Sequence, residues 1–458
     1  MLQTRVPSEF DEGLQSAARA FAEGRGREAR SLAAGLEPAA AGSAGRLMAL
    51  GELLTHLGDH AGARRTYAAA ADAAPRNPAV LYNLASAMIA TGAHAEAEAV
   101  LDAVIDLAPG DGDAWYNRTT LRRQTAQDNH VPELARALAR LSDKPQSVPL
   151  GYALAKERED LEDWRGSFEA LHEAAARRRA GLSYDVAGDV ETMAGIARVF
   201  NADWAARPSS GAPGSPIFVL GLPRTGSTLV DRILSAHSGV DSLGEIPDFA
   251  LALVQLAGGG TRAELLSRAS AVDAGALGGA YLARIAGYGA KAKRLIDKTP
   301  SNFLYLGPIL KSLPGATVVH VSRHPMDACY AIYKTLFRMG YPYSYDLSDL
   351  ARYYGAYARL MRHWRALFPG RIVEVSYEAL ANAPGPQTRQ LLEACGLPFE
   401  EACLSFHERA EPAATASAAQ VRQPIHQRSV GLWRRYAAEL APLRSALIAE
   451  GMAPEDLA

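Results

Sequence analysis

The chain has 458 residues, of which 48% are hydrophobic, and a formal net charge of -2. This composition suits about two to four packed domains, and the near-zero charge argues against bulk attraction to nucleic acid or to an acidic membrane. The three cysteines, Cys329, Cys395 and Cys403, lack metal-ligand spacing, and so few are typical of a reducing compartment. No apolar signal region and no apolar run of about 18 residues is present. We therefore expect a cytoplasmic protein without a transmembrane segment.

The N-terminal part, residues 10–205, is rich in Ala, Leu, Glu and Arg and is predicted to be helical. Pro75 and Pro109 lie 34 residues apart, which is the period of tetratricopeptide repeats. Small residues in that pattern let paired helices approach, and large ones fill the groove of the next pair. The pattern is filled by Leu47, Leu50, Gly51, Leu54, Ala63, Tyr67 and Ala70, and again by Leu81, Leu84, Ala85, Met88, Ala97, Leu101 and Val104. The sequence resembles the tetratricopeptide family over 10–180, most clearly over 44–110, with weaker copies on either side.

The alternative for this region is a plain helical bundle with a chance period. If the repeats are real, their concave surface could bind an acceptor peptide, a protein partner or a second subunit in a homodimer, and the sequence does not distinguish these. The stretch 176–205 is also predicted to be helical. A Pro-, Gly- and Ser-rich stretch follows, so we predict a repeat domain over 10–205, a linker over 206–214 and a second domain over 215–458.

In the second domain, short β-type runs alternate with helical segments. The runs are Ile217–Leu220, Thr317–Val321 and Ile372–Val375. Alternation of this kind predicts an α/β fold with a doubly wound parallel sheet. In such sheets, ligands bind at the carboxyl ends of the strands.

The first run leads into a glycine-containing loop, GLPRTGST, from Gly221 to Thr228. A buried strand, a glycine turn and a helix N-terminus together form an anion site, because the first N–H groups of the helix and its dipole attract negative charge. The spacing is that of a P-loop, except that Ser227 replaces the usual lysine. A P-loop kinase or NTPase needs that lysine, so we favour another phosphate-bearing ligand; an ordinary strand–turn–helix is the simpler alternative.

Two basic residues follow other predicted strands. Arg323 comes directly after the second run and could bind another phosphate, or it could pair with Asp327. Lys298, in the sequence DKTP, could place a point charge on a transferring group, or it could be solvated.

The combination closely resembles sulfotransferases that use 3′-phosphoadenosine 5′-phosphosulfate (PAPS), especially tyrosylprotein sulfotransferases and bacterial sulfotransferases with tetratricopeptide repeats. The resemblance covers about 215–440. It implies a P-loop-like sulfotransferase fold and sulfuryl transfer to an acceptor hydroxyl, such as a protein or peptide tyrosine or a glycan, without a metal. It implies that the first loop binds the 5′-phosphosulfate, Arg323 the 3′-phosphate, and Lys298 the reacting group. The implied cofactor residues are Arg224, Thr225, Gly226, Ser227, Thr228, Arg323, Tyr377, Ser417 and Arg422.

The resemblance also implies that Glu245, eight residues after His237, is the general base, and Arg224 is included with Glu245 and Lys298 as catalytic. A positioned carboxylate can take the proton of a hydroxyl acceptor, typically worth a factor of about 10²–10⁴. The simpler role for Glu245 is as a partner of a helix N-terminus. His237 is the reserve candidate, although a packing role is favoured for it.

One position departs from the family pattern. Ala331 stands where the family usually has a serine that binds the 3′-phosphate, and Thr335 or Ser322 would have to compensate. A lost bond to a charged group costs about 1.5–3 kcal/mol. This leaves open an interaction scaffold whose sulfotransferase domain is inactive. The tyrosines between 341 and 357 are either the lining of an acceptor channel or ordinary helix residues.

Overall fold

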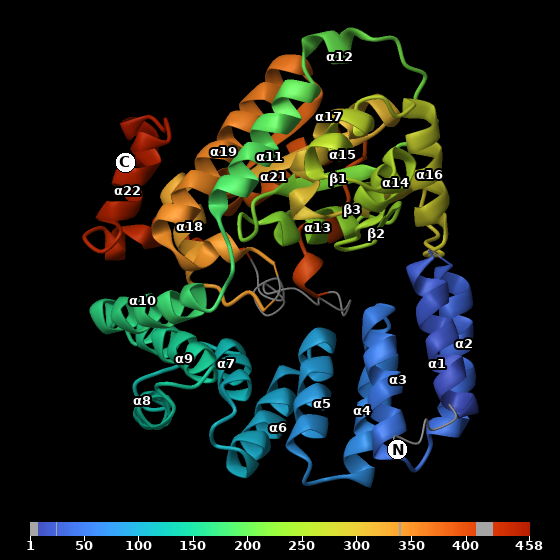
Figure 1. Cartoon of the computed structure of the whole chain (residues 1–458). Coiled ribbons are helices and arrows are strands. Elements are labelled where there is room, and N and C mark those ends of the chain that lie inside the picture. Colours follow the sequence, from blue (N-terminus) through green and yellow to red (C-terminus); the bar gives the residue numbers. More distant parts are fainter. Residues whose placement is uncertain (1–7, 24, 339, 409–424) are drawn as a thin grey trace. The chain divides into compact units, whose positions relative to one another are not determined.

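The computed structural model describes residues 8–23, 25–338, 340–408 and 425–458 (Figure 1). By compactness the described chain divides into two units, which we describe separately. The first comprises residues up to 174 together with 287–289, and the second comprises 175–286 and the described residues from 290 onwards. This division falls before the predicted linker, so the helices between residues 186 and 206 pack with the second unit. The domain boundary at 206–214 stays a prediction.

The first unit is a succession of helices that pack mainly on their neighbours in sequence. They are α1 (Glu9–Ala22), α2 (Gly26–Ala40), α3 (Ala44–His56), α4 (His60–Ala73), α5 (Pro78–Thr91), α6 (His94–Leu107), α7 (Gly112–Thr120), α8 (Val131–Arg140), α9 (Ser147–Asp160) and the start of α10 (Trp164–Ala180). Contacts mainly between adjacent helices are the expected arrangement of a helical repeat, and α7 departs from it by packing on α9.

The repeat pattern read from the sequence corresponds to the observed packing. Leu50, Ala63 and Ala70 are fully buried between α3 and α4. At Gly51, a Cβ atom would lie 2.5 Å from Cε1 of Tyr67, so only glycine lets the two helices approach this closely. The repeat therefore needs a glycine at residue 51 because the aromatic ring of Tyr67 packs directly against it.

The weaker copy of the repeat that follows residue 110 is held by a buried polar cluster. The fully buried carboxylate of Glu157 on α9 accepts hydrogen bonds from the Thr119 hydroxyl at 2.9 Å and the His130 backbone N–H at 2.5 Å. Because a buried carboxylate needs such partners, this cluster ties the non-helical stretch between α7 and α8 to α9. The sequence pattern weakens here because polar bonds replace part of the apolar packing.

The second unit contains a five-stranded sheet in the order β2-β3-β1-β4-β5, with every pair parallel. The strands are β1 (Ile217–Gly221), β2 (Val240–Ser242), β3 (Arg294–Asp297), β4 (Thr317–Ser322) and β5 (Ile372–Ser376). The predicted parallel sheet is confirmed. The short edge strand β2 was missed, because three residues of which two are polar give no β signal.

Helices cover both faces of this sheet. They are α11 (Val186–Val199), α12 (Ala202–Ala206), α13 (Ser227–Ser235), α14 (Asp248–Ala257), α15 (Arg262–Ala269), α16 (Ala274–Ala286), α17 (Leu306–Ser312), α18 (Pro325–Tyr333), α19 (Leu347–Leu367), α20 (Tyr377–Asn382), α21 (Pro384–Ala394) and α22 (Ala441–Ala449). Short 3-10 turns are η1 (Pro300–Tyr305), η2 (Pro342–Tyr345), η3 (Glu401–Cys403), η4 (Phe406–Glu408), η6 (Leu432–Tyr436) and η7 (Pro454–Leu457).

The two faces alternate along each strand, as period-two side chains require. Val219 of β1 and Val321 of β4 pack in one cluster with residues of α13 and α21. Phe218, on the other face, contacts Tyr281 of α16 with ring centroids 5.4 Å apart. α19 covers this second face beside β4, and α11 runs alongside α19 (Figure 1).

None of the helices in the described part of the chain is long and apolar enough to cross a membrane. The three cysteines are buried, and none of them forms a disulfide with another cysteine in the described part of the chain.

Candidate functional site

The loop after β1 has the backbone of an anion cradle. Arg224 and Gly226 both have left-handed φ angles, of 65° and 106°, and α13 begins at Ser227. A left-handed residue next to a helix start turns successive N–H groups towards one point. The Thr225 hydroxyl donates to the Leu222 carbonyl at 2.8 Å and closes the turn. The loop can therefore hold a phosphate or sulfate without a lysine.

The glycine in this loop is also required by a neighbour. A Cβ atom at Gly226 would lie 2.7 Å from Cδ2 of Tyr377, the first residue of α20 after β5. The two predicted cofactor-binding residues thus contact each other, although 151 residues separate them in the chain (377 minus 226).

Arg323 joins the same group. Its guanidinium lies over the Tyr377 ring, with Cζ 4.8 Å from the centroid, and its Nη1 donates to the Arg224 carbonyl at 3.2 Å. Nη2 donates to the Ser429 carbonyl at 2.5 Å. Within the described residues its buried Nε has no acceptor. A cation held over an aromatic ring with an unused N–H is suited to binding a further anion beside the loop.

Arg323 does not pair with Asp327, the alternative that the sequence left open. The buried Asp327 carboxylate accepts from the backbone N–H groups of Gly431 and Trp433, at 2.6 and 3.1 Å. The His324 ring stacks on Trp433 with centroids 5.6 Å apart. The segment from Ser322 to Asp327 therefore also anchors the C-terminal segment over the strand end, a role that the sequence did not predict.

Lys298 and Glu245 form an ion pair. The Lys298 side chain is 1% exposed and its Nζ lies 2.5 Å from Oε1 of Glu245, whose side chain is 45% exposed. Lys298 directly follows β3, and its backbone N–H donates to the Gly244 carbonyl at 2.9 Å. The pair thus presents a half-exposed carboxylate backed by a buried cation. Glu245 does not cap the next helix, because α14 has no side-chain cap.

A second polar chain fixes the peptide that follows Glu245. The Thr299 hydroxyl accepts from the Ile246 N–H at 2.9 Å and lies 2.7 Å from Oδ1 of Asp297. Asp297 is fully buried, and Tyr281 and Asn302 also donate to it, at 3.2 and 3.0 Å. Burial raises the pKa of Asp297 to about 7 despite these bonds. The sequence DKTP was predicted to act through Lys298, but Asp297 and Thr299 also have a role, because they hold the Glu245 loop in place.

His237 lies at the amino ends of the strands, opposite to the carboxyl ends where Lys298 and Glu245 meet. It precedes Val240, which pairs with Arg294 at the start of β3. Its Nδ1 accepts from the Gly239 N–H at 3.0 Å, and its ring is buried. This placement agrees with the packing role favoured from the sequence.

Ala331 is buried in α18, and α18 itself, which the structure describes throughout, offers no serine or threonine in its place. The Thr335 hydroxyl donates to the Ala331 carbonyl at 2.8 Å, so it is already used. The Ser322 hydroxyl makes only a long bond of 3.4 Å to the Val375 carbonyl. Ser417 and Arg422, predicted to bind the cofactor, lie outside the described residues.

The tyrosines of 341–357 divide into two groups. Tyr343 and Tyr353 are buried and stack with centroids 3.6 Å apart, as core residues would. Tyr341 is only partly buried; burial raises its pKa to about 12, and the charge of Glu245 adds to this effect. Tyr341 is thus electrostatically linked to the candidate base, which keeps the acceptor-channel prediction open for this residue.

Comparison with known proteins agrees with this geometry. Residues 216–401 match the model of the sulfotransferase family, and residues 54–117 match that of the tetratricopeptide repeat. The chain therefore carries tetratricopeptide repeats followed by a parallel-sheet sulfotransferase domain.

Two relatives illustrate the similarity. An uncharacterized protein of Aquifex aeolicus is 34% identical over 316 residues, which are 66% of this chain and 41% of that protein. The chain thus spans about two fifths of that relative. A Caenorhabditis briggsae protein provisionally named a protein-tyrosine sulfotransferase is 27% identical over 233 residues, covering 47% of this chain and 80% of the relative.

Solved structures are more distant. The sulfotransferase domain of the Synechococcus PCC 7002 olefin synthase has a TM-score of 0.37 and 20% identity, covering 50% of this chain and 90% of that domain. The sulfotransferase domain from the curacin biosynthetic pathway has a TM-score of 0.33 and 15% identity, covering 51% and 99% respectively.

Proposed function

We propose that the second domain transfers a sulfuryl group from PAPS to an acceptor hydroxyl. The observation that carries this proposal is the Lys298–Glu245 ion pair, which joins a buried cation to a half-exposed carboxylate at the strand ends. A P-loop nucleotide kinase is disfavoured because Ser227 stands in place of the lysine.

The residues fit a donor with two anionic groups. The loop from Arg224 to Thr228 is suited to the 5′-phosphosulfate, since its left-handed residues and helix start supply N–H donors. Arg323, with an unused buried N–H, is suited to the 3′-phosphate. Tyr377, held against Gly226, is suited to the adenine. Because PAPS and its product carry a 3′-phosphate and ATP does not, Arg323 would select against ATP.

The chemistry of the site needs a proton acceptor and a cation. Bound PAPS supplies the activated sulfuryl group and the leaving phosphate. Glu245 takes the proton of the acceptor hydroxyl, for which its partial exposure provides access. Lys298 stabilises the negative charge that develops on the leaving oxygen. Thr299 and Asp297 keep the Glu245 loop in position.

The acceptor is proposed to be a hydroxyl on a protein or peptide tyrosine, with a glycan as the alternative. Support for tyrosine comes from the name of the Caenorhabditis relative and from the repeats, which commonly bind peptides. Tyr341, whose pKa is raised in part by the charge of Glu245, would face such an acceptor.

The test is transfer of radiolabelled sulfate from PAPS into lysate, with labelled species separated by size. Glu245→Gln and Lys298→Met should reduce labelling by at least about a hundredfold while leaving the affinity for adenosine 3′,5′-bisphosphate within about threefold. Undiminished labelling with Glu245→Gln would remove Glu245 as the base. Tighter binding of ATP than of adenosine 3′,5′-bisphosphate would refute the donor.

A second candidate function is an interaction scaffold with an inactive domain. Ala331 favours it, because the Thr335 hydroxyl is bonded elsewhere and does not restore the missing donor. Ala331→Ser should then tighten adenosine 3′,5′-bisphosphate binding about tenfold or more. No transfer from wild type or from this variant, with a partner retained by the full chain, would favour the scaffold.

A further inference from the structure

Large apolar side chains gather on the exposed surface of α14. Among the described residues, five large hydrophobic side chains are exposed, and three of them lie on this helix: Leu251, Val254 and Leu256, at 43%, 41% and 44% exposure. Exposed hydrophobic residues that are scattered singly need no explanation, whereas a concentration of them marks an interaction surface. The position of α14 in the domain shows what this surface could bind.

Two of these side chains form a stripe with the residue that precedes the helix. At about 100° of turn per residue, the exposed Pro247, Leu251 and Val254 lie within about 60° of one another around the helix axis. Leu256 lies about 140° away from Leu251 and does not belong to this stripe. We call Pro247, Leu251 and Val254 the apolar stripe.

The helix that carries the apolar stripe is firmly packed, and its own charge is turned inwards. Phe249 is fully buried, and its ring centroid lies 5.5 Å from that of Tyr281 on α16. Asp248 provides the charged side chain of α14; it is buried and accepts from Nε of Arg284 at 2.9 Å. The stripe is therefore a preformed surface to which α14 contributes no charge.

The apolar stripe begins beside the candidate base. Pro247 follows Glu245 by two residues, and the Thr299 hydroxyl binds both the N–H and the carbonyl of the intervening Ile246, at 2.9 and 2.8 Å. These bonds hold the carboxylate and the stripe in a fixed relation. At 1.5 Å per residue, the stripe extends about 10 Å along α14. An acceptor hydroxyl at Glu245 would therefore bring the neighbouring part of the acceptor within reach of the stripe.

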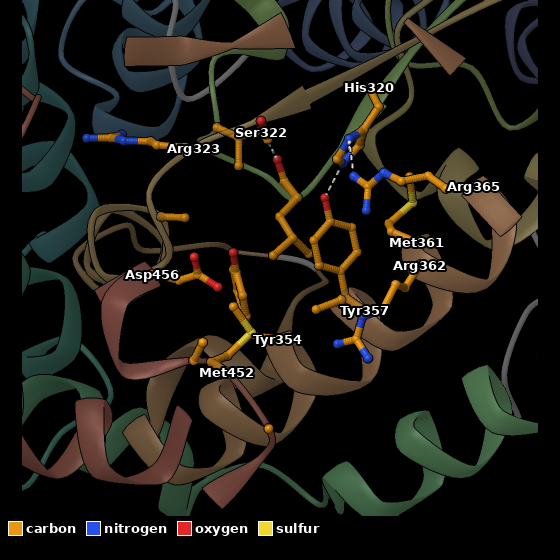
Figure 2. A pocket seen from close by; sticks show the side chains of 16 residues that line it. His320, Ser322, Arg323, Tyr354, Tyr357, Met361, Arg362, Arg365, Met452 and Asp456 are labelled. Carbon is orange, nitrogen blue, oxygen red and sulfur yellow. Dashed lines mark hydrogen bonds between the residues drawn. The ribbon is translucent and has the colours of Figure 1, made fainter. Parts of the chain in front are cut away.

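A cavity of about 300 Å³ between β4, α19 and the residues after α22 does not offer the same access (Figure 2). Its lining includes Thr225 and Arg323, which are proposed to bind the donor. None of the described residues that line it belongs to α14 or to the Glu245 loop. Figure 2 shows His320 hydrogen-bonded to Tyr357 within it. The cavity is thus continuous with the proposed donor site, and it leaves the acceptor to another surface.

We propose that the apolar stripe binds apolar residues that flank the acceptor tyrosine of an extended peptide. A helix surface contacts its ligand from one side, whereas small-molecule sites are concave and enclose most of the ligand. Alternate side chains of an extended peptide point the same way and lie about 7 Å apart. Residues two positions from the tyrosine would therefore contact the stripe while the tyrosine hydroxyl reaches Glu245. The inference rests on the proposed function, because it takes Glu245 as the base.

The test compares three synthetic peptides that differ only at the residues two positions before and two positions after a single tyrosine. These residues are leucine, serine or glutamate. Sulfate transfer from radiolabelled PAPS and calorimetric binding are both measured with the full chain. KM should be at least about tenfold lower for the leucine peptide than for the serine peptide, with kcat unchanged, because the added contact binds ground state and transition state alike. The glutamate peptide should bind no better than the serine peptide, because the stripe offers it no cation.

Variants of exposed residues test the surface with little risk to the fold. Leu251→Ser and Val254→Ser should each reduce the preference for the leucine peptide about three- to tenfold. Leu251→Lys should raise the affinity for the glutamate peptide above that for the leucine peptide. Leu256→Ser, on the same helix but outside the stripe, and Ile448→Ser on α22 remove equally exposed apolar side chains and should leave the preference unchanged. Unchanged unfolding temperatures would show that each variant is folded.

The outcomes separate this proposal from the proposed function. Binding of the leucine peptide that depends on Leu251, without sulfate transfer, would support the stripe and count against the transferase. Transfer to all three peptides with equal KM, or a preference that Leu251→Ser and Val254→Ser leave unchanged, would overturn the stripe and leave the transferase standing. Neither binding nor transfer with any of the peptides would also overturn the stripe as a peptide surface.

Discussion

Asp297 offers a quantitative test of how the buried network beside Lys298 works. Burial raises the pKa of this carboxyl from 3.8 to about 7 in the folded state. When neutral, it can donate from Oδ2 to the Tyr281 hydroxyl while Oδ1 still accepts from Thr299 and Asn302. An asparagine has the same shape, accepts at its Oδ1 and donates from its amide nitrogen, which carries one more hydrogen than the protonated carboxyl does. Asp297→Asn should therefore imitate the protonated carboxyl.

The sign of the pH effect follows from linkage. The pKa of Asp297 is higher in the folded state, so protonation of this carboxyl stabilises the fold. This contribution to the free energy of unfolding is fully present below pH 3.8 and is lost as the pH rises to about 7. Each pH unit in this window lowers the free energy of unfolding of the wild type by about 1.4 kcal/mol, so the total loss is roughly 4 kcal/mol. For the second unit this amounts to a change in unfolding temperature on the order of 5–10 °C.

The assay is the unfolding temperature of wild type and Asp297→Asn in parallel between pH 4 and 8. The two proteins should be about equally stable near pH 4, and the variant should become increasingly the more stable as pH rises. A difference that stays constant over this range, or that increasingly favours wild type, would refute the reasoning. Asp203→Asn, at an exposed carboxyl of α12, serves as a control for general charge effects.

Three further predictions concern neighbouring contacts. Thr299→Val removes the hydroxyl that holds the peptide after Glu245. We expect kcat for sulfuryl transfer to fall about 10–100-fold while the nucleotide affinity is unchanged, and Thr299→Ser should restore kcat. Gly226→Ala adds backbone strain and a clash with Tyr377, which together cost the loop conformation about 2–5 kcal/mol. Calorimetry should therefore show nucleotide binding at least about tenfold weaker. Wild-type affinity in that variant would contradict the cradle geometry. Asp327→Asn weakens the anchoring of two C-terminal backbone N–H groups by about 1–3 kcal/mol, which faster amide hydrogen exchange at 431 and 433 should report; unchanged exchange would argue against it.

The sequence predicted the repeats and the phosphate loop because both are local. In a tetratricopeptide repeat, Gly51 packs against Tyr67 of the next helix. Because this contact joins neighbouring helices, the sequence period reflects the packing. The loop from Gly221 to Thr228 is likewise continuous, and its glycines record left-handed backbone angles. Features determined by neighbours in sequence can be read without the fold.

Other expectations needed the structure to choose between alternatives. The sequence left open whether Arg323 pairs with Asp327, and only the C-terminal segment, about 105 residues further on, shows that Asp327 is bonded there instead. The strand β2 was missed because its three residues are placed by pairing with β3 and not by their own propensity.

The sequence by itself therefore determined the two kinds of domain, the phosphate loop and the basic residues that follow the strands. Only the tertiary structure decided that Lys298 contacts Glu245, that Asp297 and Thr299 support this pair, and that a cavity forms between β4, α19 and the residues after α22. The physical reason is that ion pairs, buried titrating groups and cavities depend on residues that are far apart in the chain. Lys298 bonds Glu245, 53 positions away, and Leu222 and Met452, more than 200 positions apart, line the same cavity. No local pattern in the chain encodes such contacts.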